Sequence, residues 1–269
     1  FTGDTAVGPV LYPGIDHLTT NEVTADERRA LVSLEEWVDV HTRCNHDHGL
    51  DKEQSHTAYW YRNIGSELRL IALDTVNRFG GWQGCLHREQ FEWLSHLLDE
   101  SKDKYVVLTS HHPLENLFNG YAPEEERSPA LEEELRRLLE KHPNVILWFS
   151  GHVHDHKITQ SRNSDGSHAF WEIRTGSHID WPQQSRTIEI VKSNNGKIAI
   201  GTVVFDHAGP VVFSGTPDEL ADPVALAGLS RLLAANDWQR QQDGPFNIEL
   251  LAGEPEDRNI WLWANDPLM

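Results

Sequence analysis

Cysteine, methionine, positive charge and long apolar runs are all scarce in this chain. Two cysteines in 269 residues are too few for a disulfide framework, so we interpret them as free or singly paired thiols. The chain has 23 Lys and Arg but 42 Asp and Glu. The resulting net charge of -19 opposes binding to nucleic acid or to an anionic membrane. No apolar run approaches the roughly 20 residues that a transmembrane helix needs, so we predict no membrane insertion.

The chain begins with Phe1, and its single methionine is the last residue, Met269. We therefore expect the sequence to be a fragment of a longer protein. No signal peptide is recognisable. Under this expectation its absence carries no information about secretion, and the sequence leaves the cellular compartment open.

Two apolar segments that each end in histidines are the most informative feature that is present. Residues 145–149 (VILWF) are typical of a buried strand, and they are followed by Gly151, His152 and His154. A tight turn at the glycine can direct both imidazoles toward one point, which suits a transition metal. Two surface histidines in a loop are the alternative for such a short motif.

The second apolar segment, residues 105–109 (YVVLT), ends in His111 and His112. Between the two segments we predict a helix with Ser128 as N-cap and Pro129 at its first position. A strand, helix and strand in this order place the two strands in parallel, so both histidine turns reach the same carboxyl edge of the sheet. Three or four histidines are therefore expected to converge there.

This order of strand, HHP, helix, strand and GHVH resembles the C-terminal half of the calcineurin-like metallophosphoesterases. Residues 68–75 (LRLIALDT) resemble the central strand of that family, and residues 84–94 (GCLHREQFEWL) resemble the helix that follows it. The segments TADERRALVSLEEWV, GGWQGCL and GSHIDWPQQSR also resemble an actinobacterial-type subgroup of these enzymes.

The resemblance implies an α+β fold, namely the C-terminal portion of an αββα sandwich with a mixed β-sheet flanked by helices. We assign residues 1–214 to that portion and residues 215–269 to a helical and irregular extension packed on it. Strands at 156–159 and 169–174 are predicted after GHVH, and a hairpin at 187–191 and 197–205 is expected to extend the sheet. A helix is predicted within 217–242, and residues 260–263 (IWLW) are expected to pack on the domain or on a partner.

For the site, the resemblance implies two metal ions drawn from Mn, Fe and Zn. His111 and His152 would bind one ion and His154 the other, while His112 would pack or support them. His178 follows a strand as the other histidines do, so it is a candidate for substrate binding, with a structural turn as the alternative.

The first three ligand blocks of the family, D-x-H, G-D-x-x-D and G-N-H-D/E, have no convincing match. Asn45 and His46 spell part of N-H-D, but Cys44 replaces the glycine of the block, so we interpret the segment as a loop. His48 and His56 are likewise interpreted as solvated loop histidines.

The function implied is a metal-dependent phosphoesterase that acts on a small phosphorylated mono- or diester. The missing N-terminal half of the domain would be its partner. The alternative is a catalytically inactive remnant that binds a metal or a protein.

Residues 152–156 (HVHDH) also resemble a metallo-β-lactamase-type motif, but the segment is one residue too short for it. Sheet edges left open by missing strands lead us to expect poor solubility of the chain alone.

Overall fold

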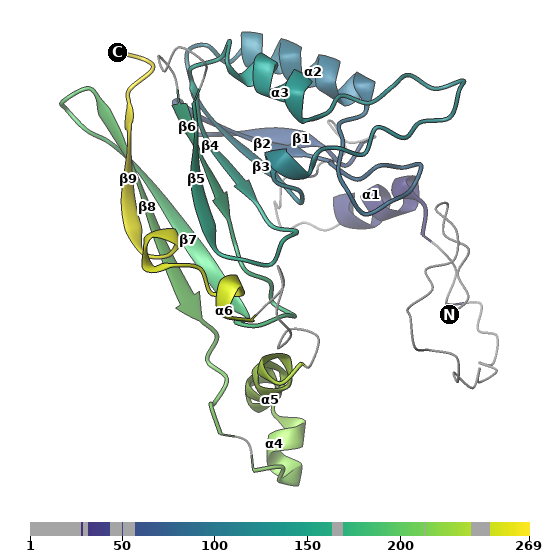
Figure 1. Cartoon of the computed structure of the whole chain (residues 1–269), viewed down its shortest axis with the longest axis vertical. Coiled ribbons are helices and arrows are strands. Elements are labelled where there is room, and N and C mark those ends of the chain that lie inside the picture. Colours follow the sequence, from purple (N-terminus) through teal and green to yellow (C-terminus); the bar gives the residue numbers. More distant parts are fainter. Residues whose placement is uncertain are drawn as a thin grey trace.

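The computed structural model describes residues 28, 32–43, 50, 57–162, 169–212, 214–237 and 248–269. Its helices and strands are shown in Figure 1. In chain order they are α1 (Leu34–Thr42), β1 (Trp60–Ile64), β2 (Leu68–Leu73), α2 (Arg88–Asp99), β3 (Tyr105–Ser110), η2 (Leu114–Asn116), α3 (Glu132–Leu139), β4 (Val145–Ser150), β5 (Lys157–Arg162), β6 (Ala169–Arg174), β7 (Gln184–Lys192), β8 (Lys197–Asp206), α4 (Pro217–Ala221), α5 (Pro223–Ala235), α6 (Ile248–Leu251), η3 (Pro255–Asp257) and β9 (Ile260–Asn265).

The first sheet has six strands in the order β1-β2-β3-β4-β6-β5. Its four inner strands are parallel, and β1 and β5 pair with them antiparallel at the two edges. The apolar runs of β3 and β4 suit this inner position, because an inner strand covered on both faces buries every side chain. The parallel arrangement confirms that the turns after β2, β3 and β4 share one edge.

The second sheet has three strands in the order β7-β8-β9. The expectation that the β7–β8 hairpin extends the first sheet is therefore wrong. Ile198 and Ile200 of β8 and Leu262 of β9 instead pack face to face against Ile146 and Ile173 of the first sheet. Burying the apolar face of the hairpin in this way removes more apolar surface from water than edge pairing would.

β9 lies in the terminal segment that was expected to be helical and irregular, and it pairs with β8 along its whole length. Leu262 of the segment IWLW is buried in the core and Ile260 packs against the same cluster, while Trp261 and Trp263 are 50% and 53% exposed. The alternation follows from the two-residue period of a strand, which sends neighbouring side chains to opposite faces. The two tryptophans therefore lie on the outer face of the second sheet.

α2 and α3 cover the face of the first sheet that the second sheet leaves open (Figure 1). α3 begins later than predicted, with Leu131 rather than Ser128 as its N-cap. The reason is a β-bridge in which Leu86 and Ala130 exchange both backbone hydrogen bonds, at 3.0 and 2.8 Å. This bridge holds the chain extended beyond Pro129.

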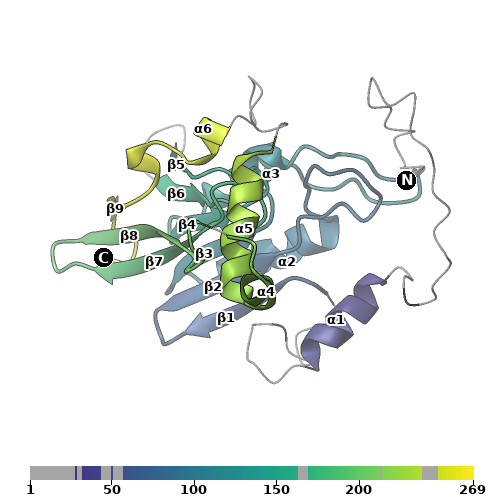
Figure 2. The same cartoon turned by 90° about the horizontal axis from the view of Figure 1, so that it is seen from below.

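The helix predicted within 217–242 is interrupted. α4 ends at Ala221. The next residue, Asp222, accepts from the Val224 N–H through its side chain and caps α5, and Pro223 occupies the first position of α5. Gln183 donates to Ser230 at 2.9 Å and so ties α5 to the loop between β6 and β7. Figure 2 shows α5 lying across this end of the molecule.

The observed architecture is a mixed α/β sandwich with a mixed parallel and antiparallel sheet flanked by helices, which confirms the predicted class. None of the described helices has both the length and the apolar character required to cross a bilayer.

Candidate metal centre

The carboxyl end of β2 is held in place by a buried glutamine of α2. Gln90 is 2% exposed, and its amide accepts from the Asp74 N–H at 2.8 Å and donates to the Asp74 carbonyl at 2.5 Å. Both backbone groups of Asp74 are thus paired where the strand leaves the sheet. This explains why the sequence pattern places a glutamine in the helix that follows the LDT strand.

The next residue, Thr75, connects β2 with the histidine turn after β3. Its hydroxyl accepts from the His112 N–H at 3.2 Å and lies 2.8 Å from His112 Nδ1, while His112 Nε2 lies 2.9 Å from the Trp82 carbonyl oxygen. A carbonyl can only accept, so His112 carries its proton on Nε2 and accepts from Thr75 at Nδ1. Both ring nitrogens are therefore engaged, and the ring supports its neighbours rather than offering a free ligand atom.

His111 and His152 face each other across the turns after β3 and β4. His111 Nε2 and His152 Nδ1 are 3.1 Å apart, and the Gly151 N–H donates to the His111 carbonyl at 3.0 Å. Two nitrogens bound to one tetrahedral metal at the usual length lie about 3.3 Å apart, so the pair fits a shared ion. The potential ligand atoms of His111, His112 and His152 all lie within 4.8 Å of one another.

The backbone of the GHVH turn is strained in order to present these rings. His152 and His154 have φ values of 69° and 65°, in the left-handed region that residues with a side chain rarely adopt. Such conformations each cost about 1–3 kcal/mol and gather at functional sites. The turn therefore adopts a conformation that a simple connection between β4 and β5 would not require.

His154 lies outside the group of three histidines and is oriented by an acid. Its Nδ1 is 2.5 Å from Asp180 Oδ2, so Nδ1–H donates to the carboxylate and the lone pair remains on Nε2. The Ser177 hydroxyl accepts from the Asp180 N–H at 3.3 Å and shapes the loop that carries the acid.

Asp180 was not singled out in the sequence. The signal that could have found it is its place after β6, the fourth parallel strand to end at this edge of the sheet. His178, the candidate in the same loop, is exposed and lies 2.9 Å from the Ser185 hydroxyl at its Nε2. This hydrogen bond connects His178 with β7 rather than with the histidine group.

Burial and the neighbouring histidines favour the neutral form of His111 and His152. Burial, followed by the neighbouring histidines, lowers the pKa of His152 to about 4, and the same causes lower the pKa of His111. Neutral imidazoles retain the lone pairs that a metal ion needs. The arrangement can therefore accept a cation near neutral pH without first losing protons.

A comparison with models of known families matches residues 2–156 to the calcineurin-like phosphoesterases, which is more than half of the chain. The chain belongs to this family. No curated protein matches it. The match also covers the residues before β2, where no ligand block was recognised from the sequence. Asn45, His46, His48 and His56 lie outside the described residues.

Two cavities flank the histidine group of this family member. One, of about 880 Å³, is lined by Trp37 of α1 together with Asp74, Arg78 and His111. The other, of about 650 Å³, is lined by Trp82 and His152 together with residues of α6 and η3. Burial raises the pKa of Asp74, and burial beside Arg78 lowers the pKa of His87 in the first cavity.

The last histidine of HVHDH takes no part in the site. His156 is fully buried, with Nε2 3.2 Å from Gln184 Oε1 and Nδ1 3.1 Å from the Arg186 guanidinium. Both ring nitrogens are used, so the metallo-β-lactamase-type interpretation has no third histidine ligand in this segment. Burial beside Arg186 lowers the pKa of His156 to about 4.

Proposed function

We propose that this member of the family hydrolyses phosphate esters in a metal-dependent reaction. The observation that carries the proposal is the 3.1 Å separation of His111 Nε2 and His152 Nδ1 in a strained turn. Neutral imidazoles brought together at the carboxyl edge of parallel strands suit a metal ion, and the family to which the chain belongs consists of phosphoesterases.

His111 and His152 would hold one ion, and His154 would offer Nε2 to a second. Imidazole donors accept Mn, Fe and Zn, so the proposed ions come from these three. When bound, such ions polarise phosphoryl oxygens and make water more acidic. The chain's own residues provide the positioning. Asp180 keeps the His154 lone pair on Nε2, and Thr75 and Trp82 fix the His112 ring behind the site.

The substrate proposed is a small phosphorylated ester. Local positive charge from bound ions would outweigh the acidic surface of the chain for a phosphate group at the site. The cavities beside His111 and His152 have volumes of about 880 and 650 Å³, which lie in the range of small-molecule sites. Monoesters and diesters both fit this proposal.

A metal-binding module without catalysis is the second candidate. Within the described residues, the cluster of His111, His112 and His152 contains imidazoles and no carboxylate. A carboxylate that bridges two ions would strengthen the case for a dinuclear hydrolase. This observation favours the second candidate enough to require a test that separates binding from turnover.

The test is elemental analysis after incubation with Mn, Fe or Zn, paired with hydrolysis of p-nitrophenyl phosphate and bis-p-nitrophenyl phosphate. His152→Gln removes a proposed ligand, and His96→Gln is the matched control because His96 is an exposed histidine of α2. Metal and turnover lost only in His152→Gln would support the hydrolase. Metal without turnover would support the binding module, and no metal in the unaltered chain would refute both.

A further inference from the structure

Trp82 is a large exposed side chain directly beside the histidine group. Its indole is 64% exposed, and it stacks on His152 with ring centroids 5.8 Å apart and an interplanar angle of 24°. Its backbone carbonyl accepts the hydrogen bond from His112 Nε2 at 2.9 Å. Burial in the core therefore does not account for this tryptophan, although the same histidines that form the site hold it in position.

The loop that carries Trp82 is fixed from a second side. Asn119 donates to the Gly80 and Gln83 carbonyls at 2.7 and 3.3 Å, on either side of the tryptophan. Gly81 has a φ of 91°, and a Cβ there would lie 2.6 Å from the Asn119 amide nitrogen, so a glycine is needed for this approach.

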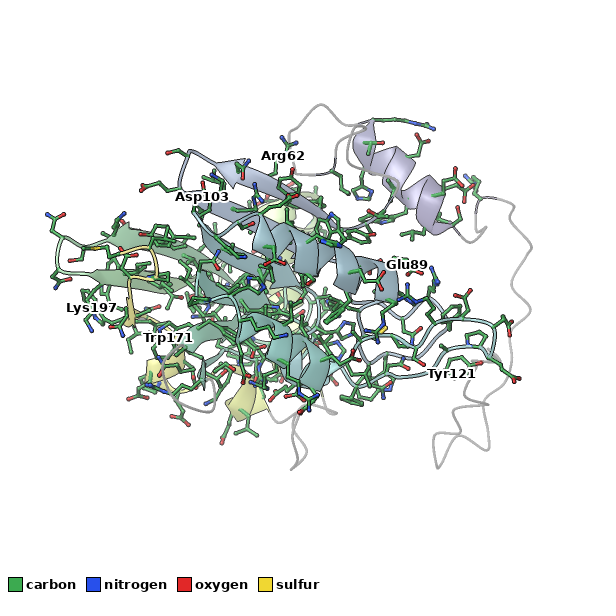
Figure 3. The ribbon with its side chains drawn as sticks, turned by 90° about the horizontal axis from the view of Figure 1, so that it is seen from above. Arg62, Glu89, Asp103, Tyr121, Trp171 and Lys197 are labelled. Atoms are coloured by element: carbon green, nitrogen blue, oxygen red, sulfur yellow. The ribbon has the colours of Figure 1, made fainter. Side chains whose placement is uncertain are left out.

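A further hydrogen bond, from Asn77 to the Tyr121 carbonyl at 2.9 Å, joins this loop to the one between η2 and α3. Tyr121 marks the second loop in Figure 3. The indole is thus presented by a pre-organised backbone, which lowers the entropy lost when a ligand stacks on it.

The cavity of about 650 Å³ begins at this indole and at His152. Its lining holds five acidic and two basic side chains, namely Glu115, Asp155, Glu249, Glu254 and Asp257 against Lys157 and Arg174. Both cations are engaged by carboxylates: Arg174 donates to Asp155 at 2.9 and 2.7 Å, and Lys157 donates to Asp257 at 3.0 Å. The described lining of this cavity therefore has no cation in surplus to neutralise an anionic group.

We propose that Trp82 determines substrate specificity by stacking on a planar aromatic leaving group that carries no negative charge. This rests on the proposed phosphoesterase function and names the class of ester: aryl or heteroaryl phosphates, neutral or cationic in their alcohol portion. The phosphate would lie at the histidines, and the ring would enter the cavity along the exposed indole face. Edge or offset stacking of this kind raises affinity by about 3- to 10-fold.

The test is equilibrium binding of phenylphosphonate and methylphosphonate to the Mn²⁺-loaded protein by titration calorimetry. These two compounds share the anionic head and differ in the ring. Trp82→Phe retains a planar face, and Trp82→Leu retains apolar bulk without one. Trp261→Leu is the control, because Trp261 is a half-exposed tryptophan on the outer face of the second sheet.

Phenylphosphonate should bind about 3- to 10-fold more tightly than methylphosphonate. The preference should persist in Trp82→Phe and Trp261→Leu and vanish in Trp82→Leu, with manganese content unchanged. A 4-carboxyphenylphosphonate should lose the preference because of its added charge. Equal affinity for the two phosphonates, or a preference that survives in Trp82→Leu, would overturn the proposed role of Trp82 and leave the proposed phosphoesterase function untouched. No binding of either phosphonate to the unaltered protein would overturn the proposed function itself.

Discussion

Replacing Gln90 by Met tests whether the amide of this buried residue holds the carboxyl end of β2. Met has nearly the same helix propensity and a similar length, so α2 should form as before. The change removes the acceptor for the Asp74 N–H and the donor for the Asp74 carbonyl. The two backbone groups would then lie unpaired beside the core.

The magnitude follows from those two lost hydrogen bonds. Each buried backbone group left without a partner costs about 1–3 kcal/mol. Asp74 is half-buried, so water can reach part of its backbone. We therefore expect the free energy of unfolding to fall by about 2–3 kcal/mol, near the lower end of the combined range. That loss is a large share of the stability of a typical domain.

The assay is equilibrium unfolding in urea followed by tryptophan fluorescence, with His96→Met as the control in the same helix. His96 is exposed, so the control should change the free energy by less than about 0.5 kcal/mol. Hydrogen exchange of the Asp74 amide supplies a second measurement, because its protection should disappear in Gln90→Met alone. A loss of stability equal to that of the control, with the amide still protected, would refute the reasoning.

Three further predictions concern single side chains. Asp180→Ala should weaken metal binding by about 10- to 100-fold because His154 loses its orienting acceptor, and calorimetry with Asp218→Ala as control measures this. Burial raises the pKa of Cys85 to about 11, so iodoacetamide at about pH 8 should label it only after denaturation, as mass spectrometry would show. Burial raises the pKa of Glu172, so the contribution of this residue to stability is present at low pH and is lost as pH rises. The unfolding free energy of Glu172→Gln relative to the unaltered chain should therefore increase between about pH 4.5 and about pH 8. A difference that stays constant over this range would contradict the prediction.

The sequence by itself determined the strands that carry the site and the edge at which the site lies. The apolar runs before His111 and His152 are too continuous for half-exposed strands, and a helix between them requires a right-handed parallel connection. The alternating patterns at 187–191 and 197–205 also predicted the hairpin that β7 and β8 form.

Tertiary structure alone decided which side chains meet. Asp180 is bonded to His154 although 26 positions separate them in the chain, and Trp82 meets His112 across 30 positions. The β7–β8 hairpin likewise packs on a face that is formed by strands elsewhere in the chain. The first residue of α3 also depends on a distant partner, because Ala130 is held in a bridge with Leu86. A local pattern specifies the period and the ends of an element, but the contacts between elements are selected by the total apolar burial and hydrogen bonding of the whole fold.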